Sequence, residues 1–240
     1  AMPLMPDIST HGFWIDWTII TITIVTVLVA VLTFGLIIAA LINFRQKNNP
    51  TATAHLSGWI TRLVVLDFVM IFFDIVIAVV STSGWAQTIL VGEEELIREH
   101  GKPAHVQVVG RQFFWSFGYP GADDNFDTAD DFTLANELVV QQGQLVILTV
   151  TSGDVIHSFF APNLRVKYDA IPGRETRVWF VPQETGEYSV LCTELCGLGH
   201  YQMLATIRVL PTEEYQGWLQ TKSVNLGDLD GDYIATAPPY

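Results

Sequence analysis

The chain has 240 residues, half of them apolar, and a formal net charge of −13 at pH 7. Its mean hydropathy is positive, at +0.34, which favours a small membrane-anchored protein over a soluble enzyme. The acidic composition and the lack of a phosphate-binding glycine loop give no reason to expect a nucleic-acid partner. The sequence also has no Ser-His-Asp context typical of a hydrolase.

The first long apolar segment is Trp17–Phe44, and no charged residue lies between Asp16 and Arg45. A helix of about 20 apolar residues is enough to cross the hydrocarbon core of a bilayer. A cleavable signal peptide would have a basic leader, whereas no Lys or Arg precedes Arg45. The segment therefore predicts a transmembrane helix.

A second apolar segment, Trp59–Val80, contains Arg62, Asp67 and Asp74. Its length predicts a second crossing, and the alternative is a buried helix of a soluble domain. Asp67 and Asp74 are seven residues apart and share one helix face. Because charged groups inside a membrane span face protein or water rather than lipid, we expect this face to pack on a larger membrane partner.

The basic residues near the two spans predict their orientation. Arg45, Lys47 and Arg62 lie in or beside the connector, whereas the N-terminal segment has Asp7 and Asp16 and no basic residue. Short loops rich in Lys and Arg stay in the cytoplasm. We therefore expect both termini on the periplasmic side of a bacterial inner membrane.

From Ala104 onward the pattern changes to short β-rich runs separated by turn residues, which predicts an all-β sandwich or barrel. These runs are His105–Val109, Phe113–Phe117, Phe132–Val140, Leu145–Thr151, Val155–Phe160, Thr176–Val181, Glu187–Leu191 and Leu204–Leu210. Thr212 is expected to cap a short helix over Tyr215–Lys222. The predicted segments are an N-terminal segment (1–16), a helical hairpin (17–84), a connector (85–103), the β domain (104–211), and a short helix with a tail (212–240).

The segment 192–203 concentrates soft metal ligands. It holds both cysteines of the chain, Cys192 and Cys196, together with His200 and Met203. Thiolate, thioether and imidazole favour copper over calcium or magnesium, and His157 supplies a second imidazole. Two cysteines are one too many for a mononuclear blue-copper site, but they suit a pair of copper ions. A disulfide or a zinc site remains an alternative for the same residues.

Three motifs together resemble subunit II of haem-copper cytochrome c oxidases: Asp154–Pro162, Lys167–Arg174 and Cys192–Met203. The resemblance implies a membrane α hairpin followed by an all-β, cupredoxin-like Greek-key sandwich or barrel with a dinuclear copper A centre. It also implies that the chain accepts electrons from cytochrome c or a similar periplasmic donor. The electrons would pass to haem in catalytic subunit I, where oxygen is reduced and protons are translocated.

The resemblance further implies a role for each matching residue. The implied copper ligands are His157, Cys192, Glu194, Cys196, His200 and Met203. The two cysteines would bridge the coppers, each histidine would bind one of them, and Met203 and the Glu194 carbonyl would complete the set. The Glu194 carboxylate would bind a magnesium ion shared with the catalytic subunit. Asp169 and Arg174 would lie on the same interface.

An aromatic run, Gly110–Tyr119, resembles the place where electrons enter the family's copper domain. It implies that Phe113, Phe114 and Trp115 carry electron uptake and transfer, although the family usually has Trp where Phe113 stands. Aromatic residues at strand spacing also fit a simple core. A second departure is Ala54–Trp59, which lacks the carboxylate that many members use to admit protons.

Residues 85–240 contain 21 acidic and 9 basic residues, a net charge of −12. This surface either is merely solvated or attracts a basic donor. Two other functions stay open at this point: the copper A subunit of a nitric oxide reductase, and a membrane-tethered copper carrier. Related quinol oxidases lose the copper ligands, so the intact set argues against that class.

Overall fold

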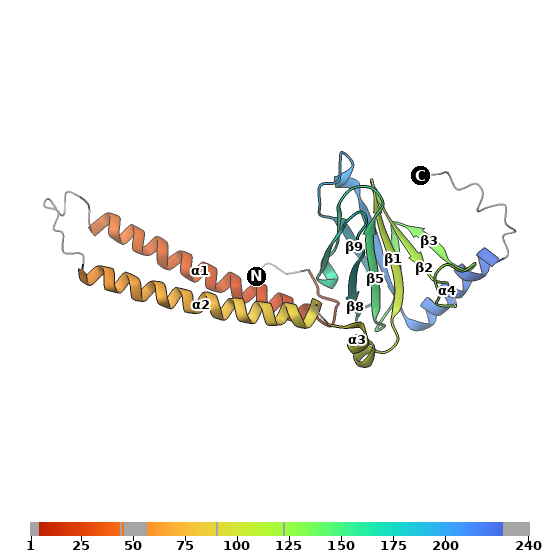
Figure 1. Ribbon diagram of the computed structural model, residues 1–240, viewed down its shortest axis with the longest axis horizontal. Coiled ribbons are helices and arrows are strands. Elements are labelled where there is room, and N and C mark those ends of the chain that lie inside the picture. The colour runs from red at the N-terminus through yellow and green to blue at the C-terminus, as the bar shows by residue number, and fades with distance from the viewer. Residues whose placement is uncertain (1–4, 44, 46–56, 90, 122, 228–240) are drawn as a thin grey trace. The chain divides into compact units, whose positions relative to one another are not determined.

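The computed structural model describes residues 5–43, 45, 57–89, 91–121 and 123–227. The chain divides into two units, one formed by Trp14–Leu90 and the other by the residues on either side of it. The first unit is a helical hairpin and the second is built mainly of strands (Figure 1).

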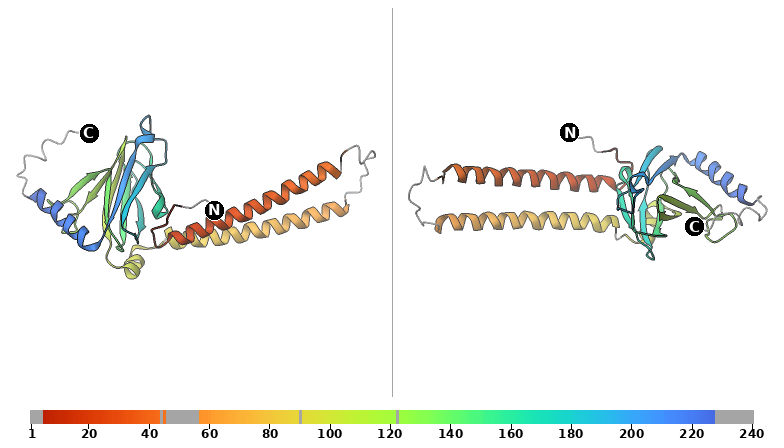
Figure 2. Two further views of the ribbon diagram at one scale, coloured as in Figure 1. Left: turned by 180° about the vertical axis from the view of Figure 1, so that it is seen from behind. Right: turned by 90° about the horizontal axis from the view of Figure 1, so that it is seen from above.

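Both predicted spans are helical. Helix α1 covers Gly12–Asn43 and α2 covers Ser57–Ile89, and the two run side by side (Figures 1 and 2). The apolar parts that could cross a membrane are Gly12–Asn43 and Val64–Gly84, with mean hydropathies of 2.9 and 2.6. Asp67 and Asp74 are exposed on α2, and the segment Ala54–Leu56 lies outside the described residues.

The second unit is a two-sheet sandwich, so the predicted fold class is confirmed. One sheet has the order β3-β2-β1-β5-β8 and the other has the order β4-β10-β9-β6-β7. The first sheet contains β1 (Ala104–Arg111), β2 (Phe114–Tyr119), β3 (Phe132–Ala135), β5 (Val146–Ser152) and β8 (Thr176–Phe180). The second contains β4 (Glu137–Gln141), β6 (His157–Ala161), β7 (Val166–Ala170), β9 (Gly186–Cys192) and β10 (Leu204–Leu210). The pairs β1–β5 and β4–β10 are parallel, and the other pairs are antiparallel.

The core lies between the sheets and follows the alternation expected of strands. On β2, Trp115, Phe117 and Tyr119 are buried, whereas the residues between them are only partly buried. Phe159 on β6 meets Trp115 from the opposite sheet, with ring centroids 5.4 Å apart and planes at 88°. Such edge-to-face contacts add to the burial of aromatic surface in holding the two sheets together.

Some elements differ from the sequence prediction. The run Phe132–Val140 forms two strands in different sheets, because Asn136 adopts a positive φ of 58° and turns the chain. Asn tolerates this conformation better than most residues. Here the Asn136 side-chain Oδ1 accepts a hydrogen bond from the main-chain N–H of Trp115 at 2.8 Å. Phe113 lies in the turn before β2 rather than in a strand.

The segment expected as a connector contains α2 up to Ile89 and a further helix, α3 (Glu93–His100). Three acidic residues lie in the first turn of α3, and Arg98 and His100 lie in its last turn. These charges complement the helix dipole. After the sandwich, α4 covers Thr212–Gly227 and is longer than predicted.

The N-terminal residues pack on the β unit instead of standing apart from it. Ile8 is 1 % exposed within this unit. Its N–H donates to the Asn163 carbonyl at 2.9 Å, and its carbonyl accepts from the Gln183 N–H at 2.7 Å. Residues 5–11, which precede α1, are therefore part of the same unit as the sandwich.

Candidate metal centre

The predicted metal ligands gather at one end of the second sheet. His157 begins β6, Cys192 ends β9, and Met203 immediately precedes β10. The strands β6 and β9 are neighbours, and Phe159 pairs with Cys192. Residues 192–203, here called the copper loop, connect β9 to β10, which are also paired, so the loop starts and ends on adjacent strands of the sheet.

The two sulfur atoms of the cysteines form the middle of the cluster. Cys192 Sγ lies 3.8 Å from Cys196 Sγ. Cys192 Sγ is 3.9 Å from His157 Nδ1, and Cys196 Sγ is 3.6 Å from His200 Nδ1. Each thiol thus has one imidazole nitrogen beside it, an arrangement that suits two metal ions better than one.

Each thiol also has one weaker donor nearby. Met203 Sδ lies 3.8 Å from Cys196 Sγ, and the Glu194 carbonyl oxygen lies 3.3 Å from Cys192 Sγ. The structure therefore brings together all the predicted copper-ligand atoms. Their arrangement has an approximate symmetry, with one cysteine, one histidine and one weak donor on each side.

The donors fit bridging metal ions better than a disulfide. Both cysteines are free, and their 3.8 Å separation is far longer than the about 2.0 Å of a disulfide. Two metal–sulfur bonds of about 2.3 Å, as in zinc thiolates, can join sulfur atoms up to about 4.6 Å apart. His157 and Met203 are fully buried, and the two cysteines are 8 % and 4 % exposed. A buried, soft donor set of this kind is suited to copper.

The cluster also has the electrostatics of a cation site. Burial and the neighbouring Cys192 raise the pKa of the Cys196 thiol to about 11. Two thiolates this close repel each other unless positive charge lies between them, and a bound metal ion supplies that charge. The site therefore favours metal binding with release of the thiol protons.

Asp154 orients the buried histidine. Its Oδ1 lies 2.8 Å from His157 Nε2, and its Oδ2 accepts the main-chain N–H of Gln112 at 2.7 Å. Burial alone would raise the pKa of the Asp154 carboxyl, but hydrogen bonds from His157, Gln112 and Val155 outweigh it and keep that pKa below its ordinary value. A carboxylate only accepts hydrogen bonds, so His157 Nε2 carries the hydrogen and Nδ1 is left to bind metal.

Comparison with known proteins agrees with this geometry. Residues 104–210 match the family model of the cytochrome c oxidase subunit II periplasmic domain. A probable cytochrome c oxidase subunit 2 of Rickettsia bellii is 30 % identical over 236 residues, which cover 93 % of this chain and 82 % of the relative. The chain belongs to the cytochrome c oxidase subunit II family. A second member, from Cereibacter sphaeroides, is 28 % identical over 251 residues, covering 91 % of this chain and 78 % of that one.

Membership in this family makes the chain a membrane protein with a periplasmic cupredoxin-like domain, and a subunit of a haem-copper oxidase complex. Its Cys, His and Met cluster is typical of the copper site of subunit II. Among solved structures, the periplasmic domain of subunit II of cytochrome oxidase from Bradyrhizobium japonicum has 32 % sequence identity and a TM-score of 0.46. It covers 51 % of this chain and 95 % of that one.

The three aromatic residues predicted for electron uptake lie in different places. Phe113 is 36 % exposed, and its ring packs on the copper loop. The ring lies so close to Gly199 that a Cβ added to this glycine would be only 2.6 Å from Phe113 Cγ. Trp115 is fully buried, and its ring centroid is 6.0 Å from that of His157. Phe114 is half-buried on β2. Phe113 is thus the member of this trio at the surface beside the cluster.

The residues predicted to face the catalytic subunit are on the surface. Asp169 lies on the edge strand β7 opposite Ser158, and its carboxylate is 3.8 Å from Lys167 Nζ. Arg174 and the Glu194 side chain are also exposed. All of these positions are open to contact with another subunit.

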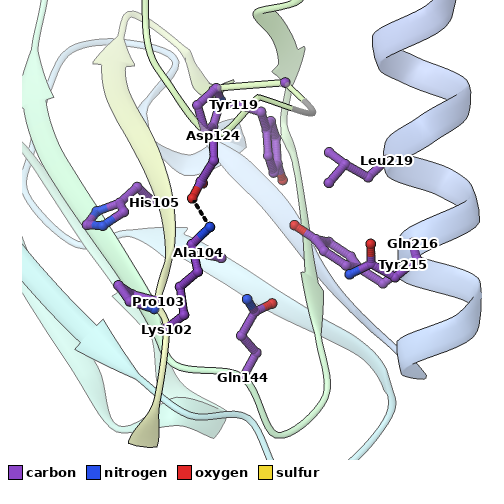
Figure 3. A pocket seen from close by; sticks show the side chains of 12 residues that line it. Lys102, Pro103, Ala104, His105, Tyr119, Asp124, Gln144, Tyr215, Gln216 and Leu219 are labelled. Atoms are coloured by element: carbon purple, nitrogen blue, oxygen red, sulfur yellow. Dashed lines mark ion pairs between the residues drawn. The ribbon is translucent and has the colours of Figure 1, made fainter. Parts of the chain in front are cut away.

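A separate cavity of about 250 Å³ lies between the start of β1 and α4 (Figure 3). Lys102 and Asp124 form an ion pair of 2.6 Å in its wall, and Tyr215 and Gln144 also line it. The part of β1 that lines the cavity ends at His105, whereas the cluster approaches the same strand at Gly110. At a rise of about 3.3 Å per residue, these two positions are about 16–17 Å apart, so the cavity is not part of the metal centre.

Gly110 on β1 is required by the close approach of His157. A Cβ added at Gly110 would lie 2.9 Å from His157 Cδ2 and 3.1 Å from Trp115 Cζ3. We expect Gly110→Ala to displace the imidazole and to lower copper affinity about tenfold, as judged from copper titration. Gly118→Ala is the matched control, because its Cβ would have 3.6 Å of clearance. Equal copper affinities in the two variants would contradict this account.

Proposed function

We propose that the chain is the electron-accepting subunit of a terminal haem-copper oxidase, with a dinuclear copper A centre in the described cluster. Electrons would come one at a time from cytochrome c or a similar periplasmic donor and would pass to haem in catalytic subunit I. Oxygen reduction and coupled proton translocation would take place in that partner. The observation that carries this proposal is the pair of thiols 3.8 Å apart, each with one imidazole beside it.

The residues of the chain would have distinct tasks in this function. A bound copper pair supplies one-electron redox chemistry. The cysteines would bridge the pair, His157 and His200 would each bind one ion, and Met203 and the Glu194 carbonyl would complete the two sets. Because most of these donors are buried on a rigid sheet end, they would move little when the charge of the centre changes.

The exposed side chains of the copper loop support the proposal that a redox partner docks there. Three apolar side chains of the loop are strongly exposed: Leu195 at 79 %, Leu198 at 97 % and Tyr201 at 74 %. Exposed apolar groups of this size are typical of interaction sites. We propose that the electron donor contacts this region and that electrons enter the chain at Phe113. Phe114 and Trp115 would follow Phe113 on the path of electron transfer.

The partner that receives the electrons would be the catalytic subunit. We propose that the exposed Glu194 carboxylate binds a magnesium ion shared with that subunit, since hard oxygen donors suit this ion. Asp169 and Arg174 would lie in the same interface. The hairpin would cross a bacterial inner membrane with its basic connector in the cytoplasm and with the copper domain and both termini on the outer side.

Burial of the donors favours this function over a copper carrier. A carrier needs exposed, exchangeable ligands, whereas His157 and Met203 are 0 % exposed. Rapid loss of copper to a mild chelator would favour the carrier instead. A nitric oxide reductase with a copper A subunit would be recognised by assaying the purified complex with oxygen and with nitric oxide.

The deciding experiment is electron paramagnetic resonance of the full chain in detergent, loaded with copper after reduction of its thiols. One electron shared evenly over two copper nuclei gives a seven-line hyperfine pattern, and this is the expected result. A four-line pattern, or no uptake of copper by the reduced protein, would rule the proposal out.

The charge of the chain makes a further prediction about the donor. Because residues 85–240 have a net charge of −12, long-range electrostatic attraction should raise the association rate of a basic electron donor. We expect the second-order rate constant of reduction to fall about tenfold when ionic strength rises from about 0.01 M to 0.15 M, as charges become screened. Stopped-flow kinetics with a neutral small reductant are the control, and that rate should stay constant. A salt-independent rate with the basic donor would contradict electrostatic attraction.

A further inference from the structure

The turn between β1 and β2 contacts both halves of the metal centre. Because β1 ends at Arg111 and β2 begins at Phe114, Gln112 and Phe113 form the whole connection. A Cβ added at Gly197 would lie 2.7 Å from Gln112 Nε2 and 3.1 Å from Phe113 Cε1. The copper loop therefore packs directly on this turn, with little space between the two segments.

The main chain of Gln112 holds the histidine side of the centre. Its N–H donates to Asp154 Oδ2 at 2.7 Å. The other oxygen, Oδ1, accepts from the Val155 N–H at 2.6 Å and from His157 Nε2 at 2.8 Å. These donors fix the plane of the carboxylate, and the carboxylate in turn fixes the imidazole. The nitrogen left without a hydrogen, His157 Nδ1, is the one that faces Cys192 Sγ at 3.9 Å.

The side chain of Gln112 holds the cysteine side of the centre. Its amide Nε2 donates a hydrogen bond to the main-chain carbonyl of Cys196. The thiol of Cys196 is the middle of the cluster, with Cys192 Sγ at 3.8 Å and His200 Nδ1 at 3.6 Å. The chain then turns at Gly197 with a φ of 137°. Fixing the Cys196 carbonyl therefore fixes the peptide from which the rest of the copper loop departs.

We propose that Gln112 is a positioning residue that joins the two sides of the copper centre, His157 through Asp154 and Cys196 through its carbonyl. This inference rests on the copper function proposed above. The side chain of Gln112 is itself exposed, so it contributes little to the hydrophobic core. Its replacement should leave the domain folded and change the geometry of the centre.

The first test replaces the side chain and keeps the main chain. Gln112→Leu removes the amide donor, and copper titration of the full chain in detergent should show a loss of affinity of about tenfold or more. Loss of a hydrogen-bond partner that orients a metal ligand costs about 10–100-fold in affinity. The seven-line hyperfine pattern should also change in spacing. Gln142→Leu is the matched control, because Gln142 Nε2 makes the same kind of bond, to the Gln183 carbonyl at 2.7 Å, outside the centre.

The second test concerns the histidine and does not need copper. Nitrogen NMR of the metal-free, reduced chain should show His157 with its hydrogen on Nε2. Asp154→Asn cannot accept from both Gln112 and His157 with the same geometry, so we expect it to give a mixture of the two imidazole tautomers. Circular dichroism of every variant checks that the domain is folded.

The outcomes separate this inference from the proposed function. A Gln112→Leu protein with the affinity and spectrum of the unmodified chain would overturn the positioning role, and so would equal losses in Gln112→Leu and Gln142→Leu. If the unmodified chain took up no copper but Asp154→Asn still changed the tautomer of His157, the proposed function would fail. The link from Asp154 to the imidazole would then be supported on its own.

Discussion

The Cys196→Ser protein is expected to lose the signal of an electron shared between two copper ions. Cys196 Sγ lies within 4 Å of the sulfur atoms of Cys192 and Met203 and of the Nδ1 atom of His200. A serine hydroxyl is a hard oxygen donor and binds copper poorly in place of a thiolate. Loss of a hydrogen bond that orients a ligand lowers metal affinity about 10–100-fold. Loss of a direct ligand should lower copper affinity by more than this. Any copper that remains should give a four-line pattern.

Ser158→Ala provides the control for this substitution. Ser158 is fully buried beside His157, and its Oγ has no hydrogen-bond partner among the described residues. Removing an unpaired hydroxyl should cost little stability, and it leaves every proposed ligand in place. The control should therefore keep the seven-line pattern. A Cys196→Ser protein that also kept it would show that the second thiolate does not bridge the metals.

The cluster of candidate copper ligands could be anticipated from the sequence because most of its members lie within one short segment. Cys192, Cys196, His200 and Met203 fall in a loop of twelve residues, and His157 lies in a motif of its own. Soft donors at such spacing have few other uses. The structure places their donor atoms as a single cluster, and no long-range contact had to be guessed except the pairing of β6 with β9.

The residues that support the ligands could not be predicted in the same way. Gln112 lies 42 residues before its partner Asp154 and 84 residues before Cys196. A glutamine in a turn has no local pattern that indicates its partner. Asp154 had a weak signal, since it precedes His157 by three residues, but an Asp at that place also fits an ordinary turn. Supporting residues of this kind depend on tertiary contacts.

The strand predictions failed where local and tertiary preferences differ. β7 was not predicted, because Lys167 and Asp169 make Val166–Ala170 too polar to indicate a buried strand. Charged side chains are acceptable there because β7 is an edge strand that pairs only with β6 in its sheet. The alternation of β2 was predicted, but its start was placed at Phe113, which instead belongs to the turn.

The second large effect expected is the loss of stability on replacing Trp115 by alanine. Trp115 is fully buried and contacts Phe159 from the opposite sheet, with ring centroids 5.4 Å apart. Removing a buried Trp side chain leaves a cavity and costs about 3–5 kcal/mol. Because the Trp115 ring also lies beside His157, at a centroid distance of 6.0 Å, copper affinity should fall together with stability.

Denaturant unfolding of the metal-free chain, monitored by near-ultraviolet circular dichroism, measures this loss in the free energy of unfolding. Trp115→Phe is the comparison variant. The indole Nε1 of Trp115 has no hydrogen-bond partner among the described residues, so exchanging it for Phe removes no hydrogen bond. That variant keeps an aromatic ring between the sheets and leaves a smaller cavity, so it should lose only about 1–2 kcal/mol. A similar loss in both variants would mean that the indole makes a specific polar contact. A loss below about 1 kcal/mol in Trp115→Ala would mean that the sheets do not pack through this residue.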